Sequence, residues 1–181
     1  MQCGHCVAIC PTGAISIPDY DMSDVEEFEK ERFGFDIERF LYTIKARRSI
    51  RNYEERPVER EKLEKILQAG RYTATGVNRQ DCRFIIVQDG IQKLKNMIWD
   101  GVENAMNSPA ITSEAMRAVY RNVIEKRTRG VDFLFRNAPA VIYIAADGPT
   151  SACLAAQNME LAAISQGLGI LYNGYLLGQP T

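Results

Sequence analysis

The most informative stretch for the architecture is residues 151–174, which reads SACLAAQNMELAAISQGLGILYNG. Its first part, 151–166, is rich in alanine and predicts a helix whose small side chains allow close packing against neighbours. The run GLG at 167–169 predicts the end of that helix. The apolar residues 170–172 then predict a short strand that leads into an Asn-Gly pair.

Two apolar, β-rich runs lie upstream of this helix. Residues 82–88 and 139–146 each predict a strand, and turn residues follow the first of them. Together with 170–173 they predict a mixed, mostly antiparallel sheet surrounded by helices, which is an α+β fold. The alternative is a doubly wound α/β domain. It is disfavoured because no glycine-rich phosphate loop follows either buried strand.

The helical domain is predicted to begin near Asp36, a residue type that caps helix N-termini well. Four apolar side chains follow at i, i+3, i+4 and i+7 spacing, which predicts a helix with one buried face. These side chains are Ile37, Phe40, Leu41 and Ile44. Further helices are predicted from Pro57 to Gly70, over 91–106 and over 113–129.

The composition is that of an ordinary globular protein. The 181 residues are 46% hydrophobic and 25% charged, enough for one domain and a short appendage. We predict a Cys-rich segment at 1–17, an acidic linker at 18–35 and a main domain at 36–181. The linker is polar and has few packing residues. We expect the main domain to be C-terminally incomplete, because the fold that it resembles has further elements after these.

Charge and cysteine usage exclude several classes of protein. The 22 basic and 23 acidic residues give a formal net charge of -1, so no global basic field attracts nucleic acid. No apolar run is long enough to cross a bilayer, and no secretory segment is present. Three of the five cysteines lie in the first ten residues, which argues against a disulfide framework. These features predict a reduced, cytoplasmic protein.

The N-terminal cysteines have the spacing C-x2-C-x3-C-P. They are Cys3, Cys6 and Cys10, and they resemble the back part of the bacterial 4Fe-4S ferredoxin pattern. The resemblance implies that Cys3 and Cys6 ligate one cluster and Cys10 a second. The first cysteine of the pattern would precede Met1, so neither cluster can be completed from this chain. The alternatives are a zinc knuckle that uses His5 and three cysteines without a ligand role.

The main domain resembles the FMN-dependent nitroreductase family in four segments whose order and spacing match. They are IKARRSIRNY at 44–53, TATGVNRQ at 73–80, NAPAVIYIAAD at 137–147 and the stretch at 151–174. The resemblance implies a nitroreductase-like fold, an FMN cofactor and a homodimer whose sites draw residues from both subunits.

The basic run after the first amphipathic helix is the expected phosphate side of the FMN site. Guanidinium groups bind phosphate with forked hydrogen bonds. The resemblance implies phosphate and ribityl contacts for Arg47, Arg48 and Ser49, and it places Arg51 near the pyrimidine edge of the flavin. A cation at that edge stabilises the negative charge of reduced flavin. The alternative is that the Arg47-Arg48 pair is only a solvated helix end.

Amides are the expected contacts to the flavin ring. The resemblance assigns the side chain of Asn78 to the ring face, with Gln80 as a weaker neighbour. It assigns the backbone of Asn173 and Gly174 to the flavin N5 and O4 edge, where a residue without a side chain permits close approach. The alternative for Asn78 is ordinary turn chemistry.

Two cysteines and several aromatic residues are assigned to packing. Cys82 and Cys153 are predicted to be inert buried thiols because their surroundings are apolar. Trp99 and the aromatic residues of 120–135 are predicted to pack in a core, with a substrate pocket as the alternative.

The predicted function is an FMN-dependent oxidoreductase that reduces nitro, quinone or similar organic acceptors. No protein acid or base is evident, since the flavin N5 does the chemistry. Electrons are expected from ferredoxin through iron–sulfur clusters or from NAD(P)H. The alternatives are a non-catalytic flavin or iron–sulfur electron-transfer or redox-sensing module, and a fragment without function.

Overall fold

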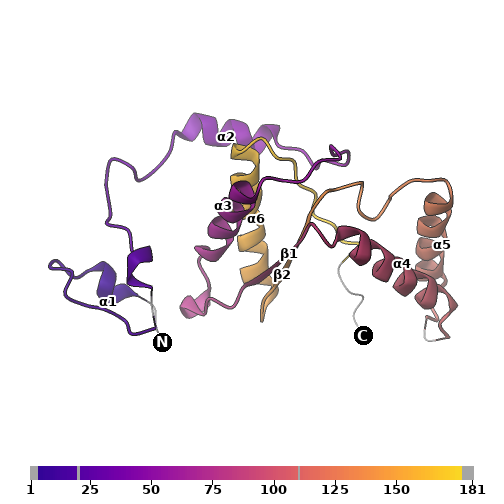
Figure 1. Ribbon diagram of the computed structural model, residues 1–181, viewed down its shortest axis with the longest axis horizontal. Coiled ribbons are helices and arrows are strands. Elements are labelled where there is room, and N and C mark those ends of the chain that lie inside the picture. The colour runs from indigo at the N-terminus through magenta and orange to yellow at the C-terminus, as the bar shows by residue number, and fades with distance from the viewer. Residues whose placement is uncertain (1–3, 20, 110, 177–181) are drawn as a thin grey trace. The chain divides into compact units, whose positions relative to one another are not determined.

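The structure is a computed structural model that describes residues 4–19, 21–109 and 111–176. The chain divides into two compact units, Met1–Arg47 and Arg48–Thr181. The two units are described separately below, and Figure 1 gives the element labels.

The first unit contains three short helical elements. They are α1 at His5–Ala8, the 3-10 turn η1 at Met22–Asp24 and α2 at Ile37–Ala46. Helix α2 begins as predicted, because an Asp36 carboxylate oxygen accepts a hydrogen bond of 2.7 Å from the Arg39 amide.

The apolar face of α2 corrects the prediction of burial. Its four predicted core side chains are Ile37, Phe40, Leu41 and Ile44, and no residue of α2 is buried. Ile37 is 57% exposed and Ile44 is 44% exposed. An amphipathic stripe is buried only where another element packs on it, and the described part of the first unit provides no such element.

The second unit holds the remaining helices and both strands. Its predicted helices are confirmed with boundaries shifted by a few residues, the usual uncertainty of helix ends. The elements are α3 at Arg60–Arg71, η2 at Gly76–Asn78, β1 at Arg83–Val87, α4 at Ile91–Asn107, α5 at Glu114–Thr128, β2 at Val141–Ala145 and α6 at Pro149–Ser165.

Strands β1 and β2 form an antiparallel pair in which Ile85 lies opposite Tyr143. The α+β prediction therefore holds, with a smaller sheet than expected among the described residues. The strand predicted at 170–173 is wrong. Among the described residues, the segment makes one backbone hydrogen bond to another part of the chain, from Ile50 N to Ile170 O, and one local turn bond, from Leu176 N to Asn173 O, which is not a strand ladder.

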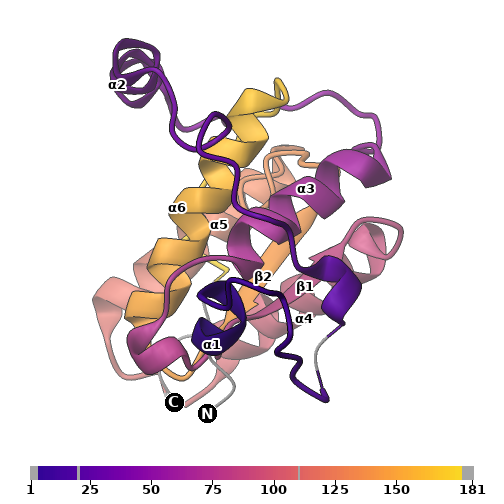
Figure 2. The same cartoon turned by 90° about the vertical axis from the view of Figure 1, so that its left-hand side faces the viewer.

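Helices α3 and α6 lie side by side against the sheet, as Figures 1 and 2 both show. Their approach is close because Gly70 faces the Met159 sulfur and the Phe84 ring. A Cβ atom at Gly70 would lie 2.8 Å from each of them. Gly70 was predicted near the helix stop, and α3 does end one residue later, at Arg71; Gly70 is also a packing residue. The buried side chains Ile66, Met159 and Ala163 form the core here.

A second apolar core joins α4 and α5 to the segment before β2. Its buried members are Trp99, Val123, Leu134 and Phe135. The prediction that Trp99 packs in a core is confirmed, since it is 5% exposed. This core holds the segment 131–137 in place through the buried side chains of Leu134 and Phe135.

The end of α6 agrees with the prediction from the sequence. Gly167 has a φ of 75°, and the Leu168 amide donates to the Ala163 carbonyl, so the helix ends as predicted.

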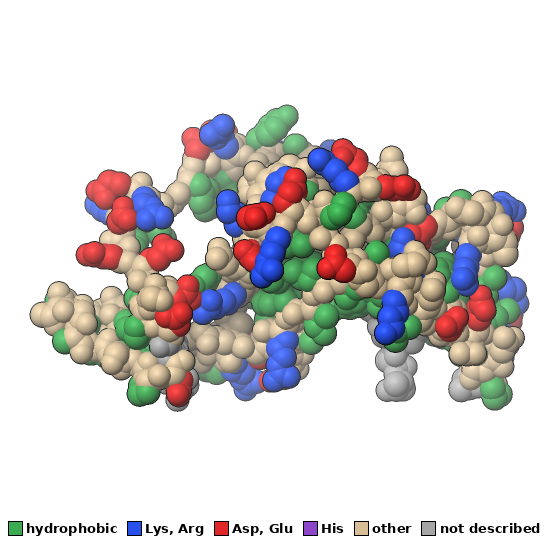
Figure 3. All heavy atoms as spheres, in the orientation of Figure 1, with side chains coloured by type: hydrophobic (Ala, Val, Ile, Leu, Met, Phe, Trp, Pro, Cys, Tyr) green, Lys and Arg blue, Asp and Glu red, His purple; other side chains and the backbone are tan. Residues whose placement is uncertain are grey.

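Figure 3 shows basic and acidic side chains intermixed over α3, where Arg60 pairs with Glu64. Among the described residues, no helix combines the length and apolar character needed to span a bilayer.

Candidate flavin site

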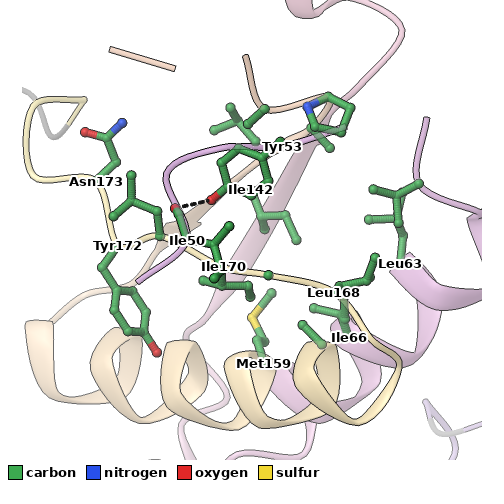
Figure 4. Close-up of a pocket in the computed structure, with 18 of the residues that line it drawn as sticks. Ile50, Tyr53, Leu63, Ile66, Ile142, Met159, Leu168, Ile170, Tyr172 and Asn173 are labelled. Carbon is green, nitrogen blue, oxygen red and sulfur yellow. Dashed lines mark hydrogen bonds between the residues drawn. The ribbon is translucent and has the colours of Figure 1, made fainter. Parts of the chain in front are cut away.

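A cavity of about 850 Å³ lies in the second unit, a volume in the range of small-molecule sites. Figure 4 shows its largely apolar wall, with Tyr53 directed toward Ile50. Four segments line it: 50–59, 135–144, 152–163 and 167–176. The polar lining consists of the amides Asn52, Gln157 and Asn173, the hydroxyls of three tyrosines, and the charged side chains Glu54, Arg56 and Glu59.

Two segments of the cavity wall are joined by a close contact that we call the seam. The Ile50 amide donates to the Ile170 carbonyl over 3.0 Å. Gly169 lies so near that a Cβ atom there would sit 2.6 Å from the Ile50 side chain. The Tyr53 hydroxyl donates 3.0 Å to the Ile50 carbonyl and completes the turn. The seam therefore brings the segment 48–53 beside the segment 169–174.

The predicted phosphate-side residues fall on both sides of the unit boundary. Arg47 is the C-cap residue of α2 and ends the first unit. Arg48 is exposed and Ser49 is half-buried at the start of the second unit. Arg51 is exposed, and its guanidinium makes a long 3.5 Å contact to the Ser49 carbonyl. An exposed guanidinium retains donors for an anionic ligand.

The Asn173-Gly174 pair presents its backbone to ligands. The Asn173 side chain is used within the protein, because its amide donates to the Leu134 carbonyl and its oxygen accepts from the Tyr175 amide. Within the described residues, neither Asn173 N–H nor Gly174 N–H donates to a protein group. A Cβ at Gly174 would meet nothing within 4 Å. These features fit two free backbone donors and open space for a flat ring.

The loop 73–80 lies beside a different cavity. Residues on both sides of Asn78 and Gln80 line a second hollow of about 480 Å³ together with the start of α6. Asn78 and Gln80 have φ angles of 50° and 51°, and Val77 also has a positive φ. The Gln80 amide donates to the Thr75 hydroxyl over 2.9 Å, which helps to hold this strained loop. The assignment of Asn78 and Gln80 to the flavin ring therefore stays a prediction.

The prediction that Cys82 and Cys153 are both buried thiols is wrong for Cys153. It is exposed and lines the first cavity, because it lies on the face of α6 opposite to the buried Ala155. Cys82 is half-buried, and burial raises the pKa of its thiol, with a smaller contribution from the charge of Asp81. No sequence signal separates the two cysteines, since both have apolar neighbours in the chain.

The described N-terminal cysteines do not form a metal centre. Cys6 lies in α1 and is exposed, and Cys3 lies outside the described residues. The Cys10 pKa is lowered to about 7, chiefly by its hydrogen bond with the Thr12 side chain. No group of three metal-binding side chains occurs among the residues with a described position. The two described thiols, Cys6 and Cys10, are fewer than the four ligands that an iron–sulfur cubane takes.

Sequence reasoning missed Tyr53 and Asn52, which line the first cavity. Tyr53 belongs to the motif IKARRSIRNY, and burial raises the pKa of its hydroxyl, although the charge of Arg51 opposes the shift. Its position at the end of that motif was the available signal. Its role in holding the seam required the tertiary structure.

The fold and this arrangement of segments agree with comparisons to known proteins. The profile of the nitroreductase family matches residues 44–179, and this chain belongs to that family. A search of curated proteins found no match.

Several solved structures are similar to the chain. An FMN-dependent nitroreductase from Clostridium difficile R20291 is 25% identical with a TM-score of 0.54, and the match covers 71% of this chain and 57% of that one. A nitroreductase with bound FMN from Desulfitobacterium hafniense DCB-2 is 27% identical with a TM-score of 0.59, covering 75% and 69%.

A BluB-like flavoprotein from Clostridium difficile 630 shares the fold at 19% identity, with a TM-score of 0.58 and coverage of 75% and 73%. This chain thus matches 57% of the length of the R20291 enzyme. The comparisons identify the family of this chain.

Proposed function

We propose that this protein is an FMN-dependent oxidoreductase that reduces nitro, quinone or similar organic acceptors. The observation that carries the proposal is the seam. In a member of the nitroreductase family, it sets the segment 48–53, which contributes Ile50, Asn52 and Tyr53 to the wall of the first cavity, beside the Asn173-Gly174 pair in the same wall. Arg48 and Arg51 belong to this segment but are not among the lining residues. One segment supplies cations for a phosphate, and the other supplies free N–H donors for a polar ring edge.

FMN, when bound, supplies hydride chemistry at its N5 atom. The chain supplies binding and orientation. Arg48 and Ser49 hold the phosphate and ribityl groups, and Arg51 places a positive charge at the pyrimidine edge. Asn173 and Gly174 donate backbone hydrogen bonds to the opposite edge, and the apolar cavity wall excludes water from the flat ring. No protein side chain is assigned as an acid or a base.

The cavity favours an enzyme over a carrier without a substrate. Its wall includes the exposed residues Cys153 and Tyr172, so small molecules have access to it. A module that only relays electrons has no need of an accessible organic-acceptor cavity beside its cofactor.

A titration of the purified chain with FMN, followed by quenching of flavin fluorescence, tests the proposal. Saturable binding is expected. The double variant Arg48→Gln/Arg51→Gln should weaken FMN affinity by about tenfold or more, since charge-assisted hydrogen bonds contribute about 1.5–3 kcal/mol. Arg60→Gln is the matched control, because Arg60 is an exposed arginine on α3 paired with Glu64. Unchanged affinity in the double variant would contradict the assigned phosphate site.

We further propose that two copies assemble into a homodimer. The exposed apolar face of α2, with Ile37 at 57% exposure, is the surface that motivates this step. Sedimentation equilibrium should report a dimer. A monomer at all concentrations would exclude it.

For the electron source we propose ferredoxin, with electrons entering through iron–sulfur clusters, one ligated by Cys3 and Cys6 and a second by Cys10, and with NAD(P)H as the competing donor. Each set has fewer thiolates than the four that a cubane takes, so further ligands would come from outside these three cysteines. Anaerobic reconstitution with iron and sulfide should give broad visible absorption that the triple Cys→Ser variant lacks. Free thiols among the described cysteines accord with a reduced, cytoplasmic protein.

A further inference from the structure

Two basic side chains converge on one aromatic ring near the candidate flavin site. The Lys126 ammonium lies 3.7 Å from the centroid of the Phe133 ring, and the Arg136 guanidinium carbon lies 4.1 Å from it. The Tyr175 ring meets Phe133 edge-on at 5.1 Å between centroids. We call Lys126, Phe133, Arg136 and Tyr175 the cationic cluster.

The two cations of this cluster have no anionic partner within the described residues, whereas nearby basic residues do. On the same helix as Lys126, Arg127 pairs with Glu103 and Arg129 pairs with Glu125. The shared ring keeps the two charges of the cluster within about 8 Å of each other. An anion placed between or beside them would relieve their repulsion.

The segment that carries Arg136 is held in a strained conformation. Arg136 and Asn137 have φ angles of 57° and 58°, a region that residues other than glycine rarely adopt. The Asp132 carboxylate fixes the turn by accepting from the Phe135 and Asn137 amides at 3.1 and 3.2 Å. The Lys95 ammonium anchors the same carboxylate at 2.7 Å. Strain that the structure maintains in this way is typical of binding sites.

The same segment is tied to the proposed ring-contact pair. The Leu134 carbonyl, next to Phe133, accepts the Asn173 side-chain amide. Tyr175 follows Gly174 directly and reaches the Phe133 ring. The cationic cluster therefore adjoins the Asn173-Gly174 pair through Leu134 and Tyr175, and its four residues lie outside the lining of the first cavity.

We propose that the cationic cluster binds the negatively charged substituent of a planar aromatic acceptor, and that this protein prefers carboxylate-bearing acceptors over neutral ones. The proposal rests on the proposed function for the role of the ligand as an acceptor. Lys126 and Arg136 pair with the carboxylate, and Tyr175 offers a ring against which the acceptor stacks.

Titration calorimetry with 4-nitrobenzoate and with its neutral counterpart 4-nitrobenzamide tests the proposal on the full chain, with and without added FMN. The carboxylate should bind about tenfold more tightly than the amide, and added salt should reduce the difference. Lys126→Gln and Arg136→Gln should each bring the two dissociation constants together, and Lys126→Arg should keep the preference. Lys93→Gln, on the exposed side of α4, is the matched control and should behave like the unmodified protein.

The outcomes separate this inference from the proposed function. Saturable FMN binding with equal affinity for the two nitro compounds would overturn the cluster and leave the flavin proposal standing. Absence of FMN binding, with a carboxylate preference that Lys126→Gln abolishes, would overturn the flavin proposal and retain an anion site. Failure of 4-nitrobenzoate to bind at all, or equal loss of preference in Lys93→Gln, would also overturn the cluster.

Discussion

Helices α2 and α6 reverse the simplest expectation about which helix is buried. Helix α2 has the clearer amphipathic pattern, yet none of its residues is buried. Helix α6 is apolar around most of its circumference and buries Ala155, Met159 and Ala163 against α3 and the sheet. An apolar stripe shows that a helix needs a partner, and small residues on both partners show how closely two helices meet. Within the described part of its own unit, only α6 has such a partner.

The largest effect that separates these helices is expected from removing one apolar side chain from each. Met159→Ala should lower the free energy of unfolding by about 2–5 kcal/mol, because Met159 is only 3% exposed and a cavity would remain. Leu41→Ala should lower it by less than about 1 kcal/mol, since Leu41 is 38% exposed. Urea denaturation followed by circular dichroism measures both values.

The contrary result is informative for α2. A large loss for Leu41→Ala that grows as the protein is diluted would mean that a second copy covers this helix. A loss independent of concentration would instead mean that α2 packs within its own chain.

A second contrast concerns two glycines in helix interiors. Gly70→Ala should destabilise the protein by about 1–3 kcal/mol, because the new Cβ would lie 2.8 Å from the Met159 sulfur and the Phe84 ring. Gly101→Ala in α4 should stabilise it by about 0.5–1 kcal/mol, since nothing lies within 4 Å and alanine is the better helix former. Opposite signs in urea melts support the close α3–α6 contact, and two stabilising changes would refute it.

A third contrast is between two cysteines: Cys153, which lines the first cavity, and Cys82, which precedes strand β1. Cys153 is exposed on α6, whereas burial raises the pKa of Cys82 and keeps its reactive thiolate scarce. At pH 8, iodoacetamide should therefore label Cys153 about tenfold faster than Cys82, as read by mass spectrometry of the two peptides. Saturating FMN should slow labelling of Cys153, and the rate at Cys82 serves as the internal reference. Equal rates would show that Cys153 is not accessible.

The smallest contrast concerns the caps of an exposed helix and a packed helix. Asp36→Ala removes the 2.7 Å acceptor of the Arg39 amide and should cost α2 about 1 kcal/mol. Amide hydrogen exchange in the first turn of α2 should rise about fivefold. Ser113→Ala in α5, where the cap bond to Met116 is 3.4 Å, should have a weaker local effect. A larger change in α5 than in α2 would contradict the two distances.

Local periodicity was enough to predict the helices and both strands of the sheet. Asp36 marks the start of α2, and the glycine at 167 marks the end of α6, because capping depends on the immediate neighbours. The strand at 170–173 was predicted wrongly because a strand needs a ladder partner, and in the part of the chain that the structure describes Ile50 gives this segment a single non-local backbone bond.

Tertiary placement accounts for what the sequence did not predict about the site. The family motifs pointed to Arg51 and Gly174, and the seam brings the two segments that contain them together. The same motifs could not show that the loop around Asn78 borders a separate hollow. The strained φ angles at Val77 and Arg136 carry no glycine signal, since surrounding contacts impose them.

The seam also limits when the site can form during synthesis. Ile50 and Ile170 are separated by about 120 residues, so their contact closes one of the longest loops in the domain. A ribosome-bound chain that has exposed residues 48–53 still lacks the segment 169–174 that the seam sets beside them. The wall of the first cavity is therefore completed only after residue 174 has been translated, and the proposed flavin site cannot form earlier.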